Sequence, residues 1–380
     1  MWRLTPRIQH YAWGSREAIA QITGRPFPTD QPEAELWMGA HPAAPSAVPT
    51  AAGERALSEF FADDPIDTLG SVVAREFEGR LPFLLKVLAP VQALSIQVHP
   101  SLAQVRDAAP GTYADDWPKP EAFYALTDFQ VFAGARPFVE TAQVCAELGL
   151  PELDELLDDA AAEEHPTRAL LESLLHLESS AQAALADQVV AACSNSSDPS
   201  LAAIVRVAQH HPRDIGLVVL LAMRYQVVPP GGYAFLPAGV LHAYVEGVAI
   251  EIMANSDNVV RAGLTAKTID VDELMRIVDL EPAVTPQHGS VLDGWTEFPA
   301  ESPYFELRCA SVSGALTVPG DGLPRILLAV HGSIEVSDSS DSVRLQPGES
   351  CFLSARDTAI TVRGDATVFL ASPGSIDAQA

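Results

Sequence analysis

The pattern of apolar and polar residues marks two stretches of the chain as β-structure. The first, Leu81–Pro100, consists of two apolar runs on either side of a proline turn. The second, Tyr225–Thr265, alternates apolar and polar residues and is interrupted by the turn sequences PPGG and PAG. Because successive side chains of a strand point to opposite faces, this alternation predicts strands that each bury one face. We expect both stretches to belong to one β domain.

The pattern between these stretches is helical. From about Val139 to Met223 the residues are rich in Ala, Leu and Glu, and apolar side chains recur at helical spacing, as at Leu171, Leu174 and Leu175. Side chains three or four positions apart share one face of a helix, so the segment predicts amphipathic helices. We interpret it as a helical subdomain inserted into the β domain.

After about Glu301 the chain returns to short β-type runs separated by Gly, Pro, Asp and Ser, which is typical of an antiparallel sandwich or barrel. The sequence therefore predicts a mainly β fold in three parts. They are a β domain of residues 1–138 plus 225–300, a helical subdomain of residues 139–224 and a C-terminal β domain of residues 301–380.

The C-terminal region also repeats the pattern of the second β stretch. Residues 229–255 align without gaps on residues 346–372, with Phe235 over Phe352, whereas Ala359 takes the place of His242. Self-similarity of this kind indicates a duplicated unit. We infer two related β barrels, of which the second has lost its polar interior; a chance match of turn residues is the alternative.

Composition and charge narrow the class of protein. The 380 residues are 48% hydrophobic and 19% charged, so the chain can bury a sizeable core. The 23 basic and 50 acidic residues give a net charge of −27, which opposes binding to nucleic acid or to an anionic membrane surface. The longest apolar stretch, Ile215–Val228, is too short to span a bilayer and is interrupted by Arg224.

The cysteines and the first residues both favour the cytoplasm. Four scattered cysteines without a CxxC spacing indicate free thiols rather than a disulfide framework or a cysteine-based zinc site. Residues 1–14 lack the basic and apolar segments of a signal peptide. We expect a cytoplasmic protein that acts as a monomer on a small molecule.

Lysine is unusually rare. Of the 23 basic residues only three are lysines, namely Lys86, Lys119 and Lys267, and the others are arginines. A lysine kept against this bias indicates a need for a compact ammonium group, for which a planar guanidinium is a poor substitute; chance retention at surface positions is the alternative.

A candidate metal site begins in the segment SIQVHP. Strand alternation places Ser95, Gln97 and His99 on one face. The candidate partners are Glu121 in KPE and His242 in HAY. Two imidazole nitrogens and two oxygens would suit Zn²⁺, although sequence spacing alone does not show that these side chains converge.

Several strings resemble those of the type I mannose-6-phosphate isomerase family, also called phosphomannose isomerases. They keep their order along the chain and are YAWG (11–14), ELWMGAH (35–41), SIQVHP (95–100), KPE (119–121), HAY (242–244) and SDNVVRAGLT (256–265). The final 80 or so residues match only in general character. One departure is Ala40, where the family usually has threonine, so a hydroxyl is lost there.

The resemblance implies a fold and a reaction. The fold is two cupin-like jelly-roll barrels with a helical insertion. The reaction is the interconversion of D-mannose 6-phosphate and D-fructose 6-phosphate through an enediolate, with one Zn²⁺ bound by Gln97, His99, Glu121 and His242.

Other residues match family positions at the active site. The resemblance gives catalytic roles to Arg261, Glu251 and Lys119. Glu251 also stands out by itself, because a carboxylate inside the apolar run AIEIMA is costly unless it is paired or functional. The base remains open among Glu251, a metal-bound water and a neighbouring polar side chain. The residues that we expect to line the substrate pocket are Trp13, Glu35, His41, Lys86, Ser95, Tyr244, Asp257 and Lys267.

Two other functions compete with the isomerase. A cupin-type iron oxygenase uses two histidines and one carboxylate, but the additional glutamine and the Lys119, Arg261 and Lys267 set argue against it. A cupin that only binds sugar would have lost the base or the cation, whereas both Glu251 and Arg261 are present.

Overall fold

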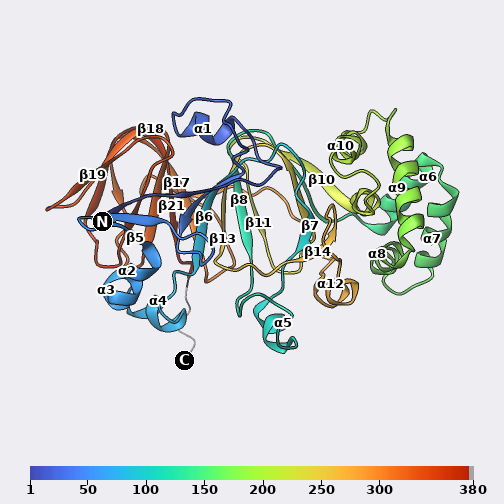
Figure 1. Cartoon of the computed structure of the whole chain (residues 1–380), viewed down its shortest axis with the longest axis horizontal. Helices are drawn as coiled ribbons and strands as arrows, with labels where there is room; N and C mark the ends of the chain where they lie inside the picture. Colours follow the sequence, from blue (N-terminus) through green and yellow to red (C-terminus); the bar gives the residue numbers. More distant parts are fainter. Residues whose placement is uncertain (376–380) are drawn as a thin grey trace.

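The computed structural model describes residues 1–375, and in it three blocks lie side by side along the long axis (Figure 1). A β block built mainly from the C-terminal region lies at one end, a second β block lies in the middle, and the inserted helices form the other end. The protein is mainly β, as the sequence predicts.

The central block consists of two antiparallel sheets. The five-stranded sheet has the order β10 (Met223–Val228), β9 (Phe129–Ala135), β12 (His242–Glu246), β7 (Ile96–Val98) and β14 (Val260–Gly263). The six-stranded sheet has the order β11 (Tyr233–Leu236), β8 (Glu121–Ala125), β13 (Ala249–Ala254), β6 (Phe83–Leu88), β3 (Glu35–Gly39) and β2 (Arg7–Gln9). Both stretches with β-type alternation therefore contribute strands to this one block.

The inserted helices lie between β9 and β10, which are neighbours in the five-stranded sheet. They are α6 (Phe138–Leu148), α7 (Pro151–Ala161), α8 (Pro166–His176), α9 (Ser179–Cys193), α10 (Pro199–Ala208), α11 (Gly216–Val219) and a 3₁₀ turn, Leu220–Ala222. Proline begins α7, α8 and α10, where its missing N–H has no helical partner to lose. The periodic leucines, among them Leu171 and Leu174, are buried and share one core with the outward side chains Ile96, Phe132 and Val260 of the sheet.

The C-terminal block is an eight-stranded antiparallel sheet. Its path is β1 (Trp2–Leu4), β20 (Ser350–Leu353), β18 (Arg325–Ser337), β21 (Ile360–Ser372), β17 (Glu306–Val318), β16 (Trp295–Glu297) and β15 (Ser290–Leu292), with β19 (Ser342–Leu345) paired to β18. In the gapless alignment of the two β regions, β20 falls over β11 and β21 covers β13. One core joins this block to the outer face of the six-stranded sheet, where Ile326 and Phe369 pack with Leu85 and Ile252.

The remaining elements are short. Near the N-terminus they are α1 (Ala18–Ile22), the hairpin of β4 (Ala47–Thr50) and β5 (Gly53–Ala56), α2 (Leu57–Asp63), α3 (Pro65–Leu69) and α4 (Ser71–Glu76). Two further helices, α5 (Leu102–Asp107) and α12 (Val271–Ile277), flank the central block.

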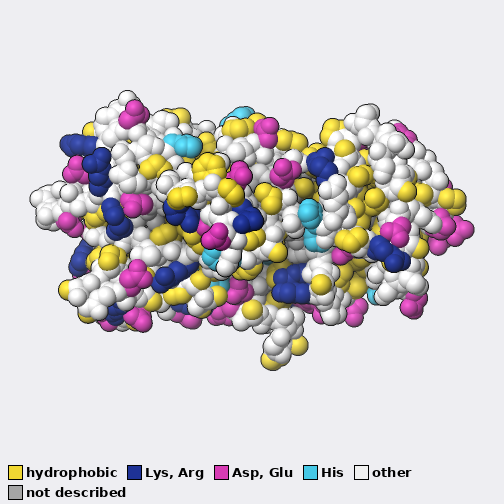
Figure 2. Space-filling view, turned by 45° about the horizontal axis from the view of Figure 1, so that its top comes forward, with side chains coloured by type: hydrophobic (Ala, Val, Ile, Leu, Met, Phe, Trp, Pro, Cys, Tyr) yellow, Lys and Arg dark blue, Asp and Glu magenta, His cyan; other side chains and the backbone are white. Residues whose placement is uncertain are grey.

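Acidic and basic side chains are interspersed over the face of the molecule shown in Figure 2. None of the helices within residues 1–375 is both long and apolar enough to cross a membrane.

Each sheet of the central block has its outer face covered by another block. The inner faces of the two sheets carry the residues described next.

Candidate metal centre and active site

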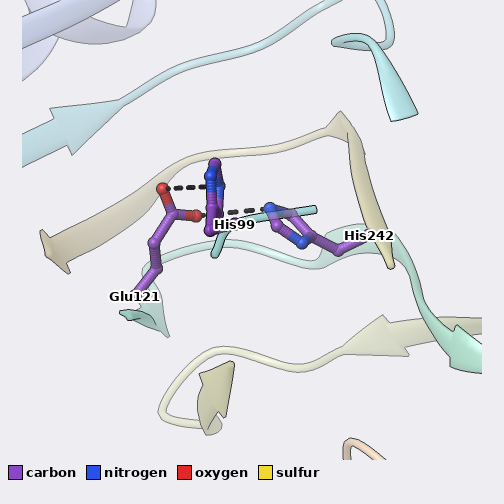
Figure 3. Close-up of side chains that lie close together, drawn as sticks. All are labelled: His99, Glu121 and His242. Atoms are coloured by element: carbon purple, nitrogen blue, oxygen red, sulfur yellow. Dashed lines mark ion pairs between the residues drawn. The ribbon is translucent and has the colours of Figure 1, made fainter. Parts of the chain in front are cut away.

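Three buried side chains from both sheets of the central block converge on one point (Figure 3). His99 follows β7 directly, His242 begins β12, and Glu121 begins β8 in the opposite sheet. His99 Nε2 lies 3.2 Å from Glu121 Oε1, and His242 Nε2 lies 3.4 Å from Glu121 Oε2. The sequence-predicted histidine and glutamate partners therefore do meet.

Backbone carbonyls fix the tautomers of both histidines. His99 Nδ1 lies 2.7 Å from the carbonyl oxygen of Asn258, and His242 Nδ1 lies 2.9 Å from that of Val240. Because a carbonyl oxygen only accepts, each Nδ1 carries a proton, and in the neutral ring the Nε2 lone pair faces Glu121. Burial, followed by the charge of Lys119, lowers the pKa of His99 to about 4, so this ring is neutral at pH 7.

This donor set fits a metal ion. His99 Nε2 is buried without a hydrogen-bond partner, and lone pairs of two imidazoles facing a carboxylate repel unless a cation lies between them. Two imidazole nitrogens and carboxylate oxygen are ligands that Zn²⁺ accepts. Burial alone would raise the pKa of Glu121, but the charge of the neighbouring Lys119 ammonium holds it well below its ordinary value, so the carboxylate is ready to bind a cation.

Gln97 lies on the same face as these ligands. It is directly opposite His242 in the β7–β12 register, and it donates from Nε2 to Ser95 Oγ over 3.1 Å. Residues directly opposite in an antiparallel pair project to the same side of the sheet. The predicted fourth ligand is therefore beside the centre.

A cavity of about 530 Å³ opens over this centre. Of the fifteen residues that the sequence assigned to the site, only His41 and His99 do not line it. The lining residues are Tyr11, Trp13, Glu35, Trp37, Lys86, Leu94, Ser95, Gln97, Lys119, Glu121, His242, Tyr244, Glu251, Asp257, Val259, Arg261 and Lys267. Two hollows of about 560 Å³ near the helices differ from it in that one is lined by a single histidine, His165, and the other by none.

Glu251 lines this cavity and belongs to a buried ion-pair network. Lys86 Nζ is 3.1 Å from Glu251 Oε2 and 3.4 Å from Glu35 Oε1, and the β6–β13 register places Lys86 directly opposite Glu251. Burial raises the pKa of Glu251 to about 7, although Lys86 opposes this shift. Burial alone would lower the pKa of Lys86, but the carboxylates of Glu251 and Glu35 raise it, so the ammonium stays charged. A carboxyl with a pKa near 7 can take and return a proton at neutral pH.

Glu35 lines the cavity and is also the second carboxylate beside Lys86. Its second oxygen accepts a hydrogen bond of 2.8 Å from the indole of Trp37, and Lys86 Nζ lies 5.2 Å from the centre of that ring. These contacts orient the ammonium group of Lys86 toward Glu251.

Three further cations line the cavity. Lys119 Nζ lies 3.0 Å from Glu121 Oε1. Arg261 is opposite Gln97 in the β7–β14 register, and its partial burial lowers its pKa. A guanidinium that lines a cavity can bind an anion through two parallel hydrogen bonds. Lys267 lines the same cavity.

The remaining predicted residues lie around these groups. Tyr244 donates to Glu121 Oε2 over 3.5 Å, and burial raises the pKa of the phenol well above its ordinary value. His41 Nε2 lies 3.3 Å from Asp257 Oδ1. His41 thus contacts a pocket residue instead of lining the pocket.

Sequence reasoning missed two aromatic residues as site candidates. Tyr11 stacks on Trp13 with ring centroids 5.5 Å apart, and both line the cavity, as does Trp37. Tyr11 and Trp37 belong to the strings YAWG and ELWMGAH, so the same strings that indicated Trp13 and Glu35 also contained this signal.

Comparisons with known proteins agree with this geometry. Residues 1–138 match the family described as phosphomannose isomerase type I, catalytic domain, and residues 295–373 match the mannose-6-phosphate isomerase cupin domain. The chain is 35% identical to the mannose-6-phosphate isomerase of Escherichia coli K12, over 96% of this chain and 97% of the relative. The chain belongs to the type I phosphomannose isomerase family. It is therefore an enzyme of the isomerase class.

More distant relatives and solved structures give the same family. The human mannose-6-phosphate isomerase is 33% identical over 93% of each chain. A crystal structure of a phosphomannose isomerase variant from Salmonella typhimurium has a TM-score of 0.91 at 31% identity and covers 99% of this chain and all of its own. A mannose 6-phosphate isomerase solved with zinc bound has a TM-score of 0.90 at 31% identity, with 98% and 99% of the two chains covered.

Proposed function

We propose that this enzyme interconverts D-mannose 6-phosphate and D-fructose 6-phosphate through an enediolate, with one Zn²⁺ at the centre formed by His99, Glu121 and His242. Gln97 is the proposed fourth ligand. The observation that carries the proposal is the pair of imidazoles whose Nε2 lone pairs face one buried carboxylate, directly beside an ion-paired glutamate. The zinc-bound relative and the isomerases that match nearly the whole chain support it.

Aldose–ketose isomerisation moves a proton between C1 and C2 of the open-chain sugar. A zinc ion, when bound, supplies charge that stabilises the negative oxygens of the enediolate. Glu251 is the proposed base, because its buried carboxyl takes a proton at neutral pH and its partner Lys86 holds it in place. Tyr244 donates its phenolic proton within the site and stays un-ionised.

The phosphate end of the substrate requires cationic donors. We assign Arg261 and Lys267 to this role, since both line the cavity. Lys119 stays beside Glu121 and is assigned to the sugar oxygens next to the metal. Ser95, Asp257, His41, Glu35 and Trp13 complete the proposed pocket.

We further propose the finer architecture and its boundaries. The first of two cupin-like jelly-roll barrels consists of residues 1–138 plus 225–300, and the second consists of residues 301–380. The helices of residues 139–224 are inserted into the first barrel. Strands β1, β15 and β16 pair across the proposed boundary with the C-terminal sheet. The enzyme is proposed to be a cytoplasmic monomer that binds neither nucleic acid nor membranes, in keeping with its charge of −27 and its free cysteines.

A coupled assay for fructose 6-phosphate formed from mannose 6-phosphate tests this function. We expect turnover in the zinc-loaded protein, loss of turnover after chelation and recovery when zinc is added back. A zinc-loaded, folded protein without turnover would remove the proposal. Oxygen consumption with iron in place of zinc would instead support the oxygenase alternative.

A further inference from the structure

A loop residue outside the sequence motifs contacts the segment whose backbone carbonyl is hydrogen-bonded to His99. Asp115 lies in the connection before β8, and its carboxylate accepts hydrogen bonds from three groups of the segment 256–258. Ser256 Oγ donates to Oδ1 over 2.8 Å, and the backbone N–H of Asp257 donates to Oδ2 over 2.8 Å. The side-chain amide of Asn258 donates to Oδ1 over 3.2 Å.

Asn258 in turn bonds to the loop of Asp115, so both the oxygen and the nitrogen of its side-chain amide have hydrogen-bond partners. Its amide oxygen accepts from the backbone N–H groups of Ala114 and Asp115, at 2.8 and 3.2 Å. Its amide nitrogen donates to the carbonyls of Asp115 and Trp117, at 2.9 and 2.7 Å. Asn258 is only 1% exposed, so these bonds form away from water and fix its position.

Asn258 links this network to the metal centre. Its backbone carbonyl accepts from His99 Nδ1, the bond that turns the Nε2 of His99 toward Glu121. Through Trp117 the same asparagine also holds the connection that leads into Glu121 at the start of β8. Two of the metal donors, from different sheets, are therefore positioned by one interaction between segments 114–117 and 256–258.

We propose that Asp115 is a positioning residue for the metal centre, which acts through Asn258 to orient the imidazole of His99. This inference rests on the metal centre proposed above. The hydrogen bond made by the second ring nitrogen of a metal-ligating histidine sets the orientation and basicity of that ring. Loss of such a hydrogen bond commonly weakens metal binding about 10–100-fold. Asp115 is itself neither a lining residue of the cavity nor a metal donor, and its one bond to a lining residue comes from the backbone N–H of Asp257.

The test compares Asp115→Asn with Asp116→Asn. The first places an amide nitrogen, a donor, against the donors of segment 256–258, while its volume is unchanged. The second removes the same charge from the adjacent, exposed residue, whose carboxylate pairs with Arg80 instead. The zinc dissociation constant of each metal-free variant is measured by competition with a chromophoric chelator, without substrate.

We expect Asp115→Asn to weaken zinc binding about 10–100-fold and Asp116→Asn to leave it within about 2-fold of the parent protein. At saturating zinc, kcat of Asp115→Asn should return to near the parent value, because the residue contacts no substrate. The visible spectrum of the cobalt-substituted centre should change in Asp115→Asn only. Unchanged zinc affinity in a folded Asp115→Asn protein would overturn the inference.

A milder variant keeps the test informative if Asp115→Asn does not fold. Ser256→Ala removes one donor to Asp115 together with the bonds of Ser256 Oγ to the Trp117 carbonyl and the Asn258 backbone N–H. It leaves the bonds of Asp257 and Asn258 to Asp115, and we expect a smaller weakening of zinc binding. Zinc affinity equal to that of the parent in Ser256→Ala, with Asp115→Asn unfolded, also counts against the inference. Failure of the parent protein itself to bind zinc would refute the metal centre rather than the role of Asp115.

Discussion

The side chains at the centre of this site are oriented by hydrogen bonds and ion pairs to neighbouring groups. The imidazoles of His99 and His242 are aimed by two carbonyl oxygens, and the ammonium group of Lys86 is held between Glu35 and Glu251. Substitution of any one of these groups would leave its buried polar partner without a hydrogen bond or ion pair. The chemistry of the site therefore depends on pairs of residues.

The raised pKa of Glu251 predicts the pH dependence of turnover. Below its pKa of about 7 the carboxyl is protonated and cannot accept the substrate proton, so kcat/KM should rise as pH increases through this value. A bound divalent cation favours the carboxylate and moves this limb to lower pH. Glu251→Gln should reduce kcat about 10²–10⁴-fold and abolish the limb. The check is a pH–rate profile.

The control for this variant is Glu246→Gln, an exposed glutamate on β12 that accepts a hydrogen bond from Gln130. It should keep the parent profile. A Glu251→Gln protein that retains both the rate and the acid limb would exclude this residue as the base.

Arg261 gives a second prediction for a single residue. A hydrogen bond to a charged partner contributes about 1.5–3 kcal/mol, so Arg261→Ala should lower kcat/KM roughly 10–100-fold or more. The control is Arg206→Ala in helix α10, whose guanidinium bonds to Gln130 away from the cavity. Steady-state kinetics of both variants decide the matter, and comparable losses in the two would contradict the placement of Arg261.

Among the strands, the metal donors come from both sheets of the central block. His99 and His242 belong to the five-stranded sheet, and Glu121 belongs to the six-stranded sheet. An ion bound between them connects the sheets across the interior of the block. Its binding energy is then also folding energy.

Removal of zinc should therefore lower thermal stability as well as activity. At a free zinc concentration 100 times the dissociation constant, binding stabilises the folded state by about 2.7 kcal/mol. We expect calorimetry to show a transition several degrees lower after chelation, restored by zinc. Equal transition temperatures with and without zinc would show that the ion does not bind between the sheets.

Local patterns predicted the strands and helices well but predicted contacts between them less well. Alternation predicted that Gln97 and His99 share a face, and both lie beside His242 in the structure. Helical spacing located the insertion, which begins at Phe138 in place of Val139. That Glu121 faces them from another sheet depends on the packing of two sheets, for which spacing holds no signal. Asp115 was not found because a loop residue has no periodicity; only its partners in space identify it.

In the whole molecule, each outer face of the central block is covered by a different neighbour. The helices pack on the five-stranded sheet and the C-terminal sheet packs on the six-stranded sheet. Phe369 of β21 contacts Tyr124 of β8, the strand that begins with Glu121, with ring centroids 5.0 Å apart. The C-terminal block therefore supports a strand that carries a metal donor.

This contact predicts that the C-terminal block stabilises the catalytic one. Phe369 is fully buried, so Phe369→Ala should lower the free energy of unfolding by about 3–5 kcal/mol through the cavity it leaves. Urea unfolding followed by tryptophan fluorescence measures this loss. Val291→Ala, at a side chain 76% exposed on β15, is the control and should change stability by less than about 0.5 kcal/mol. A loss of that small size in Phe369→Ala would show that the two blocks are energetically independent.

The position of the helices in the chain has a consequence for biosynthesis. They are inserted between β9 and β10, so the ribosome makes all of them after His99 and Glu121 but before His242. A nascent polypeptide that ends within the insertion holds a histidine and a glutamate without the second imidazole. Tight capture of zinc thus becomes available only late in translation, once the covering helices have already emerged to shield the sheet on which the last donor will settle.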